Sequence, residues 1–475
     1  MTGPGLADVL PLTPLQEGLL FHSELDAGAD VYTVQLRVDL DGELDAGRLR
    51  AAAAALLRRH ANLRVGFRHA GLERPVQVVP RHVELPWSTV DLTTGPDRRA
   101  ELDRLAAAER AHRFDLGHPP LLRLVLCRLG ERRHRLLWTS HHILLDGWSW
   151  PVLLRELVTL HDSGADSPAL PPVTPYRDYL AWLARQDRTA AEQAWADALR
   201  DAEPTLLVPG AAPARGEPAS VTAELPAEPG RRLRDRARRH GLTLNTVLQG
   251  AWALLLGALT GRSDVVFGAT VSGRPADLPG VETMVGLLIN TLPVRVRLDP
   301  ALPVAETLAR LQAGQAALSA HQHLGLADIQ RGRGPLFDTL AVFENYPVAP
   351  VAGGEGLRVT AVAGTDAVHY PAGLVAAPAG ADRIALRLHH RPEVLSTSDA
   401  RRLLDRLVAV LEAMAAGFDR PVAGIDVLTP AEHRQVRAAG TATATAAGTA
   451  TTAGAGTAAG EAAGATLPGL FAAQV

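Results

Sequence analysis

One short stretch decides how this chain is understood: residues 141–149 are His-His-Ile-Leu-Leu-Asp-Gly-Trp-Ser. The run before it, residues 135–140, is apolar enough for a buried strand, and residues 151–157 have the pattern of an amphipathic helix start. The two adjacent histidines are therefore expected at a strand-to-helix junction, followed at fixed spacing by an acid and a glycine.

Each side chain of this stretch has an expected role. Successive side chains of a strand point to opposite sides, so only one of His141 and His142 can face a cavity while the other packs. An imidazole exchanges protons near neutral pH and suits acid or base chemistry. A buried Asp146 needs a cationic partner or several hydrogen bonds, and we expect it to hold the loop. Gly147 permits a backbone conformation or a close approach that a Cβ would obstruct, so a long, thin substrate could pass beside it.

Simpler explanations compete with these roles. An isolated histidine, such as His22, His60 or His323, is more often a core or surface residue than a catalyst. Zinc binding is weakly supported, because adjacent histidines on a strand diverge and neither a cysteine cluster nor a His-Glu-x-x-His helix accompanies them. The later pair His389-His390 also has no obvious third ligand, so no metal site is predicted.

Composition indicates a large core and an ordinary charge balance. The 475 residues are 47% hydrophobic and 21% charged, enough for two domains or lobes, and the formal net charge is -3. All 48 basic residues are arginine. We interpret this bias as the imprint of a GC-rich genome, with an actinobacterial source expected, and not as nucleic-acid binding, because the arginines are scattered among comparable numbers of acids.

Cysteine usage and terminal patterns point to the cytoplasm. Cys127 is the single cysteine, which excludes disulfides within one chain. The N-terminus lacks a basic region followed by an apolar core, and no run approaches ~20 uninterrupted apolar residues. Export and membrane spanning are not expected.

Periodicity predicts two mixed α/β lobes. Strands are predicted at 31–40, 121–128 and 135–142 and helices at 45–60 and after Gly147; a proline-rich connection at 167–174 follows. The second lobe is predicted to have helices at 176–182 and 244–259 and strands at 264–269 and 291–296. Residues 438–466 are almost entirely Ala, Thr and Gly, which predicts a flexible linker, and residues 467–475 return to an apolar pattern.

Further motifs occur in a fixed order along the chain. Residues 12–22 (LTPLQEGLLFH) come first, then 141–149, then YRDY at 176–179 with Trp182, VSGRP at 271–275, VGLLINTLP at 285–293, and LFDTL at 336–340 with ENYP at 344–347. This series resembles the condensation domains of nonribosomal peptide synthetases. Six ordered motifs between residues 12 and 347 leave little room for chance.

The resemblance implies a fold and a domain organisation. The fold is α/β with mixed sheets, in which two chloramphenicol acetyltransferase-like lobes form a V-shaped pseudo-dimer with the active site in a tunnel between them. We expect an N-terminal lobe at 1–174, a C-terminal lobe at 175–437, the linker at 438–466 and, at 467–475, the truncated start of an adenylation domain. Around His369-Tyr370-Pro371 the chain departs from the family's more regular apolar strand, which puts the inter-lobe latch in doubt.

The resemblance also assigns residues. It implies that His142 is the active-site histidine and His141 its structural neighbour, that Arg274 is the salt-bridge partner of Asp146, and that Gly147 lies beside the acceptor channel. The outer motif residues are expected to pack or to fix loops: Gln16, Tyr179, Trp182, Phe337 and Tyr346.

The implied activity is amide formation by an acyltransferase of secondary-metabolite biosynthesis. An upstream carrier-bound aminoacyl or peptidyl thioester is condensed with the amino group of a downstream carrier-bound aminoacyl thioester. The segment itself is expected to bind no cofactor, since both substrates arrive on 4'-phosphopantetheine arms of partner carrier domains. His142 either removes a proton from the amine or positions the amine and stabilises the tetrahedral species.

Other functions share parts of this pattern. An epimerisation domain has the same core motif but normally ends a module, and a heterocyclising domain has aspartates in place of the two histidines. A non-catalytic docking module for a carrier or tailoring enzyme commonly has a degraded motif, whereas this one is intact. A free-standing coenzyme A-dependent acyltransferase would not need the linker and the apolar tail.

Overall fold

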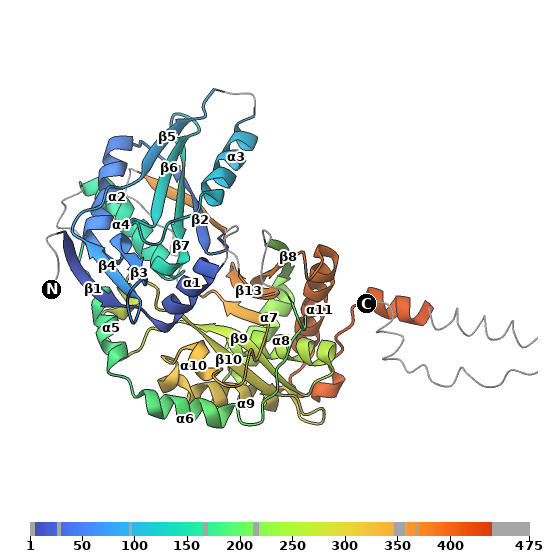
Figure 1. Ribbon diagram of the computed structural model, residues 1–475. Coiled ribbons are helices and arrows are strands. Elements are labelled where there is room, and N and C mark those ends of the chain that lie inside the picture. Colours follow the sequence, from blue (N-terminus) through green and yellow to red (C-terminus); the bar gives the residue numbers. More distant parts are fainter. Residues whose placement is uncertain are drawn as a thin grey trace, which may run out of the picture. The chain divides into compact units, whose positions relative to one another are not determined.

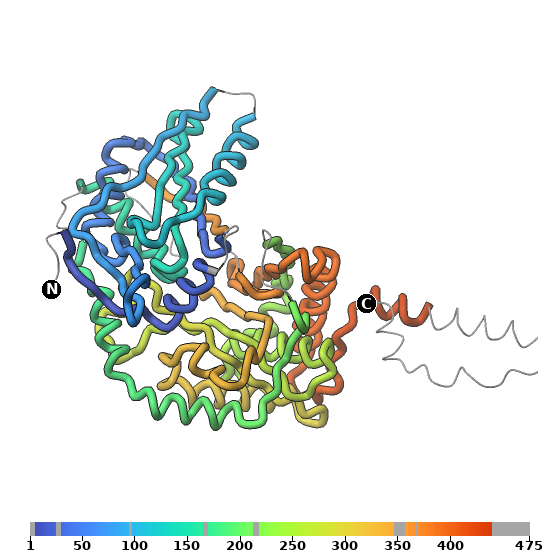
Figure 2. The backbone as a smooth tube through the Cα atoms, in the orientation of Figure 1, coloured from blue at the N-terminus to red at the C-terminus, as the bar shows by residue number. Residues whose placement is uncertain are grey.

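The computed structural model describes residues 5–25, 30–94, 97–164, 170–211, 218–345, 357–365 and 368–438. Residues up to Val427 form one compact unit, and Leu428 begins a second. The predicted linker and adenylation start lie outside the described residues, apart from Ala438. Figure 1 shows the elements of the compact unit, and Figure 2 follows the same path as a tube.

The first half of the compact unit is built on a five-stranded sheet. Among the described residues its order is β12-β2-β7-β6-β5. The strands are β2 (Thr33–Asp41), β5 (Trp87–Asp91), β6 (Leu122–Arg128), β7 (Arg133–His141) and β12 (Arg358–Thr365). Helices α1 (Pro14–Leu25), α2 (Ala46–Arg59) and α4 (Ser149–Ser163) pack in the main core of this half, and α3 (Arg98–Ala111) packs in a smaller cluster on the other face. A small sheet of β1 (Leu6–Pro11), β4 (Val76–Pro80) and β3 (Gly66–Arg68) lies alongside.

The second half is built on a six-stranded sheet of described strands in the order β10-β9-β11-β13-β14-β8. The strands are β8 (Ala219–Leu225), β9 (Asp264–Val271), β10 (Asn290–Arg297), β11 (Thr339–Phe343), β13 (Ala372–Ala379) and β14 (Arg383–His390). One large core joins its face to α7 (Ala227–Arg239), α8 (Leu244–Thr260), α9 (Val304–Ala317) and α11 (Thr397–Ala416). Helices α5 (Tyr176–Ala184), α6 (Arg188–Ala198) and α10 (Leu326–Ile329) belong to separate clusters.

Strand β12 crosses between the halves. It lies far along the chain, after β11, yet it pairs antiparallel with β2, from Arg358 opposite Asp41 to Thr365 opposite Gln35. The lobe boundary expected at residue 174 does not predict that a strand of the later part of the chain joins the sheet of the first half. Because β12 completes the edge of the five-stranded sheet, it ties the late part of the chain to the half that contains the two histidines.

The predicted elements are confirmed where they can be compared. The predicted helix at 45–60 is α2, and the side chain of Asp45 accepts hydrogen bonds from the amides of Gly47 and Arg48 as an N-cap. The helix predicted at 244–259 is α8, which begins after an N-cap at Thr243 and ends at Gly261 in the left-handed conformation. Caps and periodicity therefore fix these bounds to within a few residues.

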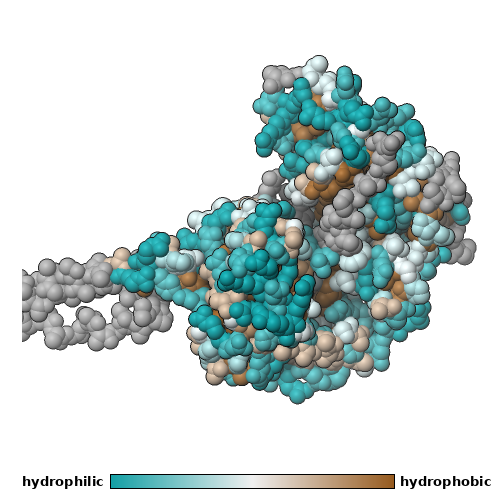
Figure 3. All heavy atoms as spheres, turned by 180° about the vertical axis from the view of Figure 1, so that it is seen from behind, coloured by the Kyte–Doolittle hydropathy of each residue, from teal (hydrophilic) through white to brown (hydrophobic). Residues whose placement is uncertain are grey.

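The surface is largely hydrophilic on the face seen from behind, with apolar side chains showing mainly where that face is hollowed (Figure 3). Among the described residues, no single helix has the length and apolar character to cross a membrane, and only the sharply bent pair α7 and α8 meets those criteria together.

Candidate active site

The two histidines sit where the sheet strand β7 gives way to irregular structure. Strand β7 ends at His141, a short 3-10 helix covers His142–Leu144, and α4 begins at Ser149. The buried side chain of Gln16 donates a hydrogen bond to the carbonyl of Ile143 (3.1 Å), and Asn62 donates to that of Leu144 (3.2 Å). These contacts hold the junction in one conformation.

His141 is buried, and both of its ring nitrogens have contacts within the protein. Its side chain is 0% exposed, and its Nε2 lies 3.0 Å from Oδ2 of Asp30 and 3.2 Å from Oγ of Ser23. The amide of Ile143 donates to its Nδ1 (3.1 Å), which assigns the proton to Nε2. Burial alone would raise the pKa of Asp30, but hydrogen bonds from His141 and from the Tyr32 amide outweigh it and lower that pKa. Both ring nitrogens are thus occupied, and neither is available to a substrate.

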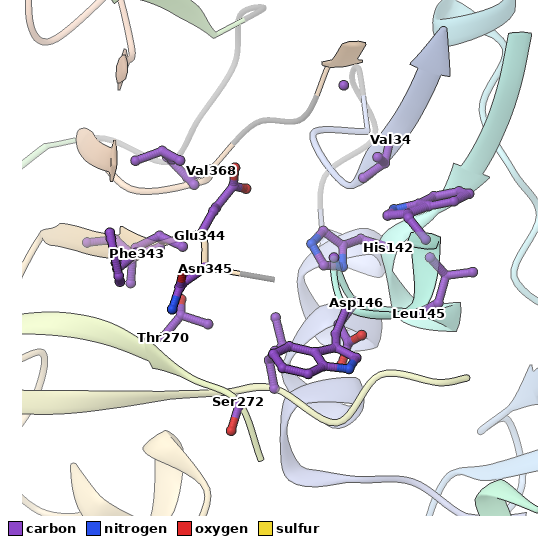
Figure 4. A pocket seen from close by; sticks show the side chains of 18 of the residues that line it. Val34, His142, Leu145, Asp146, Thr270, Ser272, Phe343, Glu344, Asn345 and Val368 are labelled. Atoms are coloured by element: carbon purple, nitrogen blue, oxygen red, sulfur yellow. The ribbon is translucent and has the colours of Figure 1, made fainter. Parts of the chain in front are cut away.

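His142 points the other way. It is half-buried and lines a large cavity, and its backbone amide donates to the carbonyl of Tyr32 (2.8 Å). Its Nδ1 is buried and has no hydrogen-bond partner among the described residues. Figure 4 shows the ring in the cavity. The expectation that the pair diverges, with one imidazole in packing and one in a cavity, agrees with this geometry.

Asp146 and Arg274 form a buried bidentate ion pair. Nη1 of Arg274 lies 2.7 Å from Oδ2 of Asp146 and Nη2 lies 3.1 Å from Oδ1, with the side chains 5% and 0% exposed. Asp146 also accepts from the amides of Leu288 (3.1 Å) and Ser149 (3.1 Å) and from the Ser149 hydroxyl (2.9 Å). The cationic partner that a buried Asp146 requires is therefore Arg274, and the pair pins two distant loops to the start of α4.

Glycines allow those loops to meet. Gly273 has a φ of +60°, and a Cβ there would lie 1.7 Å from the carbonyl oxygen of Leu288. A Cβ on Gly286 would lie 2.3 Å from the ring of Tyr176, whose hydroxyl donates to the carbonyl of Leu287 (2.7 Å). Gly147, by contrast, does not have a left-handed φ, so its backbone conformation does not require a glycine. What the glycine provides at this position is the absence of a side chain. It lines the cavity beside His142.

The cavity encloses about 1200 Å³ and is lined by residues of both sheets. His142, Asp146, Gly147 and Arg274 all contribute to its wall, whereas His141 does not. From the six-stranded side come Thr270, Ser272, Phe343 and Glu344, and Figure 4 shows them across the space from His142. A cavity of this size can hold two substrate arms next to one imidazole.

A second imidazole in the cavity was missed by sequence reasoning. Nδ1 of His369 lies 3.0 Å from the hydroxyl of Tyr32, and its ring stacks on that of His22 at a centroid distance of 4.9 Å. Burial lowers the pKa of His369 to about 3. The sequence marked this segment only as a departure from the family pattern; His369 in fact joins the region before β13 to α1 and to the chain entering β2.

The outer motif residues pack, as expected. The Tyr179 hydroxyl donates to the carbonyl of Leu288 (3.3 Å), Trp182 donates to Asp277 (3.0 Å), and the ring of Phe337 occupies the space beside Gly268. Tyr346 lies outside the described residues. Within the described chain, no group of three or more His, Cys, Asp or Glu side chains is placed to hold a metal ion.

Comparison with known proteins identifies the class. The family model of the condensation domain matches residues 6–436. One component of the linear gramicidin synthase of Brevibacillus parabrevis is 35% identical over 93% of this chain, which covers 6% of that protein. Bacitracin synthase 3 of Bacillus licheniformis is 31% identical over 90% of this chain and is covered to 7%. The chain thus spans a small part of these relatives, and their sources give no support to an actinobacterial origin.

Solved structures share the fold. The first condensation domain of the calcium-dependent antibiotic synthetase, in complex with a substrate analogue, has a TM-score of 0.77 at 22% identity, covering 89% of this chain and 100% of its own. A four-domain nonribosomal peptide synthetase bound to AMP and glycine has a TM-score of 0.76 at 18% identity, covering 91% and 35%.

The chain therefore belongs to the condensation domain family, whose members form amide bonds in nonribosomal peptide synthetases.

Proposed function

We propose that this domain condenses an upstream carrier-bound aminoacyl or peptidyl thioester with the α-amino group of a downstream carrier-bound aminoacyl thioester. The new C–N bond forms as the thioester C–S bond breaks, the donor arm leaves as a thiol, and the amine loses a proton. The observation that carries the proposal is the position of His142, whose ring faces a cavity of about 1200 Å³ lined from both sheets.

The residue roles follow the contacts. His142 is proposed to contact the attacking amine, because it is the histidine of the pair that lines the cavity. His141 is proposed to fix the strand end through Asp30, and the Asp146–Arg274 pair to hold the loops around the site. Gly147 is proposed to leave room for the acceptor arm. A thioester is already activated, so holding the two arms in register supplies much of the acceleration.

The proposed partners are two carrier domains, each bringing a substrate on 4'-phosphopantetheine, and an adenylation domain after residue 466. The resemblance of residues 467–475 to the start of such a domain supports the last assignment. Several relatives that the chain covers only in part are large synthetases, which is consistent with a multidomain setting.

The test is dipeptide formation from two loaded carriers. His142→Ala should lower the single-turnover rate by about 10²- to 10⁴-fold while leaving the melting temperature nearly unchanged, because the half-buried ring makes no side-chain hydrogen bond among the described residues. His118→Ala is the matched control, since His118 is an exposed imidazole outside the cavity. Full activity of His142→Ala would overturn the assignment and favour a docking role.

A further inference from the structure

A second arginine lines the cavity, and it has no partner in the described part of the chain. Arg274 is paired with Asp146, whereas Arg387 makes no hydrogen bond or ion pair with any described residue. Arg387 is half-buried in the wall of the same cavity as His142. Its five N–H donors make no hydrogen bond within the described chain, so they are available to a ligand in the cavity.

The sheet register directs Arg387 into the cavity. It pairs with Val375 of β13, which pairs with Val342 of β11, and both valines line the cavity as well. The flanking residues of β14, Leu386 and Leu388, are buried in the core on the opposite face. Because side chains alternate along a strand, Arg387 cannot join that core without reversing the register of β14.

The surroundings suit an anion. The carboxylate of Asp146 is already held by Arg274, and Glu344, the other acidic side chain of the cavity wall, has an interaction of its own that does not involve Arg387. The neighbouring valines, Val342 and Val375, are apolar and offer no polar group that would compete for the guanidinium. A guanidinium presents a planar fork that matches a carboxylate with two parallel hydrogen bonds.

We propose that Arg387 is a specificity residue that binds a carboxylate on the aminoacyl part of a carrier-bound substrate. The domain then prefers an aspartyl- or glutamyl-type side chain to its neutral amide isostere. This inference rests on the proposed function only in that the cavity receives the substrates. It adds a chemical class of substrate, which the motifs around His142 do not provide.

Binding tests the proposal without requiring turnover. Two probes are titrated into the whole chain by calorimetry: aspartyl-pantetheine and asparaginyl-pantetheine. In both, a stable amide replaces the thioester, and the phosphate is absent. We expect the aspartyl compound to bind about ten-fold more tightly, as for one charge-assisted bidentate contact. Arg387→Gln should remove that preference, and Arg387→Lys, which keeps the charge but not the fork, should retain part of it.

The control is Arg383, on the same face of the same strand. Arg383→Gln removes an equal charge, but this arginine is exposed, pairs with Glu224 (3.4 Å) and lies outside the cavity wall, so the preference should persist. The proposal is overturned if the wild-type chain binds both compounds equally, or if the preference survives Arg387→Gln. It is also overturned if Arg387→Gln weakens only the binding of 4'-phosphopantetheine that carries no amino acid. Failure of the proposed function is a separate result, seen as absent peptide formation with substrate binding intact.

Discussion

Breaking the Asp146–Arg274 pair should destabilise the domain strongly. Arg274→Ala leaves the carboxylate of Asp146, which is 0% exposed, with three hydrogen bonds from Leu288 and Ser149 but no counter-charge. It also leaves the carbonyl of Met284 without the arginine donor at 3.2 Å. Removing one partner of such a buried pair costs about 3–5 kcal/mol.

This cost can be converted into a melting temperature. An unfolding entropy of roughly 2.1 cal/mol/K per residue, over the 427 residues of the compact unit, gives ~0.9 kcal/mol/K. Arg274→Ala should therefore lower the melting temperature by about 3–6 °C in differential scanning calorimetry. The exposed pair Arg383–Glu224, at 3.4 Å, is the control, and Arg383→Ala should shift the midpoint by less than about 1 °C.

A double-mutant cycle separates the ion pair from simple loss of side-chain volume. Asp146→Asn and Arg274→Gln each leave one buried charge unpaired, whereas the double variant leaves none. The double variant should be more stable than the sum of the single losses by about 1–3 kcal/mol, or roughly 1–3 °C. Additive losses, or an Arg274→Ala shift no larger than that of Arg383→Ala, would show that the pair does not support the fold.

Two further perturbations test the loop geometry and the second imidazole. Gly273→Ala should lower the melting temperature at least as much as Arg274→Ala, because its Cβ would lie 1.7 Å from the Leu288 carbonyl oxygen at a φ of +60°. The control is Gly314→Ala in α9, where a Cβ would have no neighbour within 4 Å and the change should be neutral or stabilising. Burial lowers the pKa of His369 to about 3, whereas a histidine in the unfolded chain is protonated below about pH 6.5. The unfolded state therefore binds one more proton than the folded state between these values, and the free energy of unfolding should fall as the pH falls from about 7 toward 4. His369→Gln should flatten that loss in a series of thermal melts, and parallel curves for the two proteins would count against a neutral buried ring.

Local patterns predicted much of this molecule because local physics determines it. The helix α2 follows from Asp45 as an N-cap and an apolar stripe, and the divergence of His141 and His142 follows from strand geometry. The pairing of Asp146 required a cation, but only family resemblance pointed to Arg274, since no spacing in the sequence links residues 128 positions apart.

Local sequence patterns could not predict the long-range pairings, because no local rule specifies a partner far along the chain. Strand β12 has mostly exposed small residues, and its partner β2 lies more than three hundred positions earlier, so its alternation says nothing about which sheet it joins. The anchoring of His141 by Asp30 and the contact of His369 with Tyr32 depend on loops whose course is set by the packed halves. Arg387 belongs to no motif, and only the register of β14 places it in the cavity.

The contacts around His142 bear on its chemical role. In a histidine paired with a carboxylate, the acid accepts the Nδ1 proton, fixes the base-competent tautomer and stabilises the protonated ring. Here Asp146 cannot serve, because five hydrogen bonds from Arg274, Leu288 and Ser149 occupy its oxygens. Nδ1 of His142 is buried with no acceptor among the described residues, so a protonated ring would bury an unpaired N–H donor. The geometry therefore removes Asp146 from any proton relay with His142 and leaves Nε2 as the ring nitrogen available to an amine.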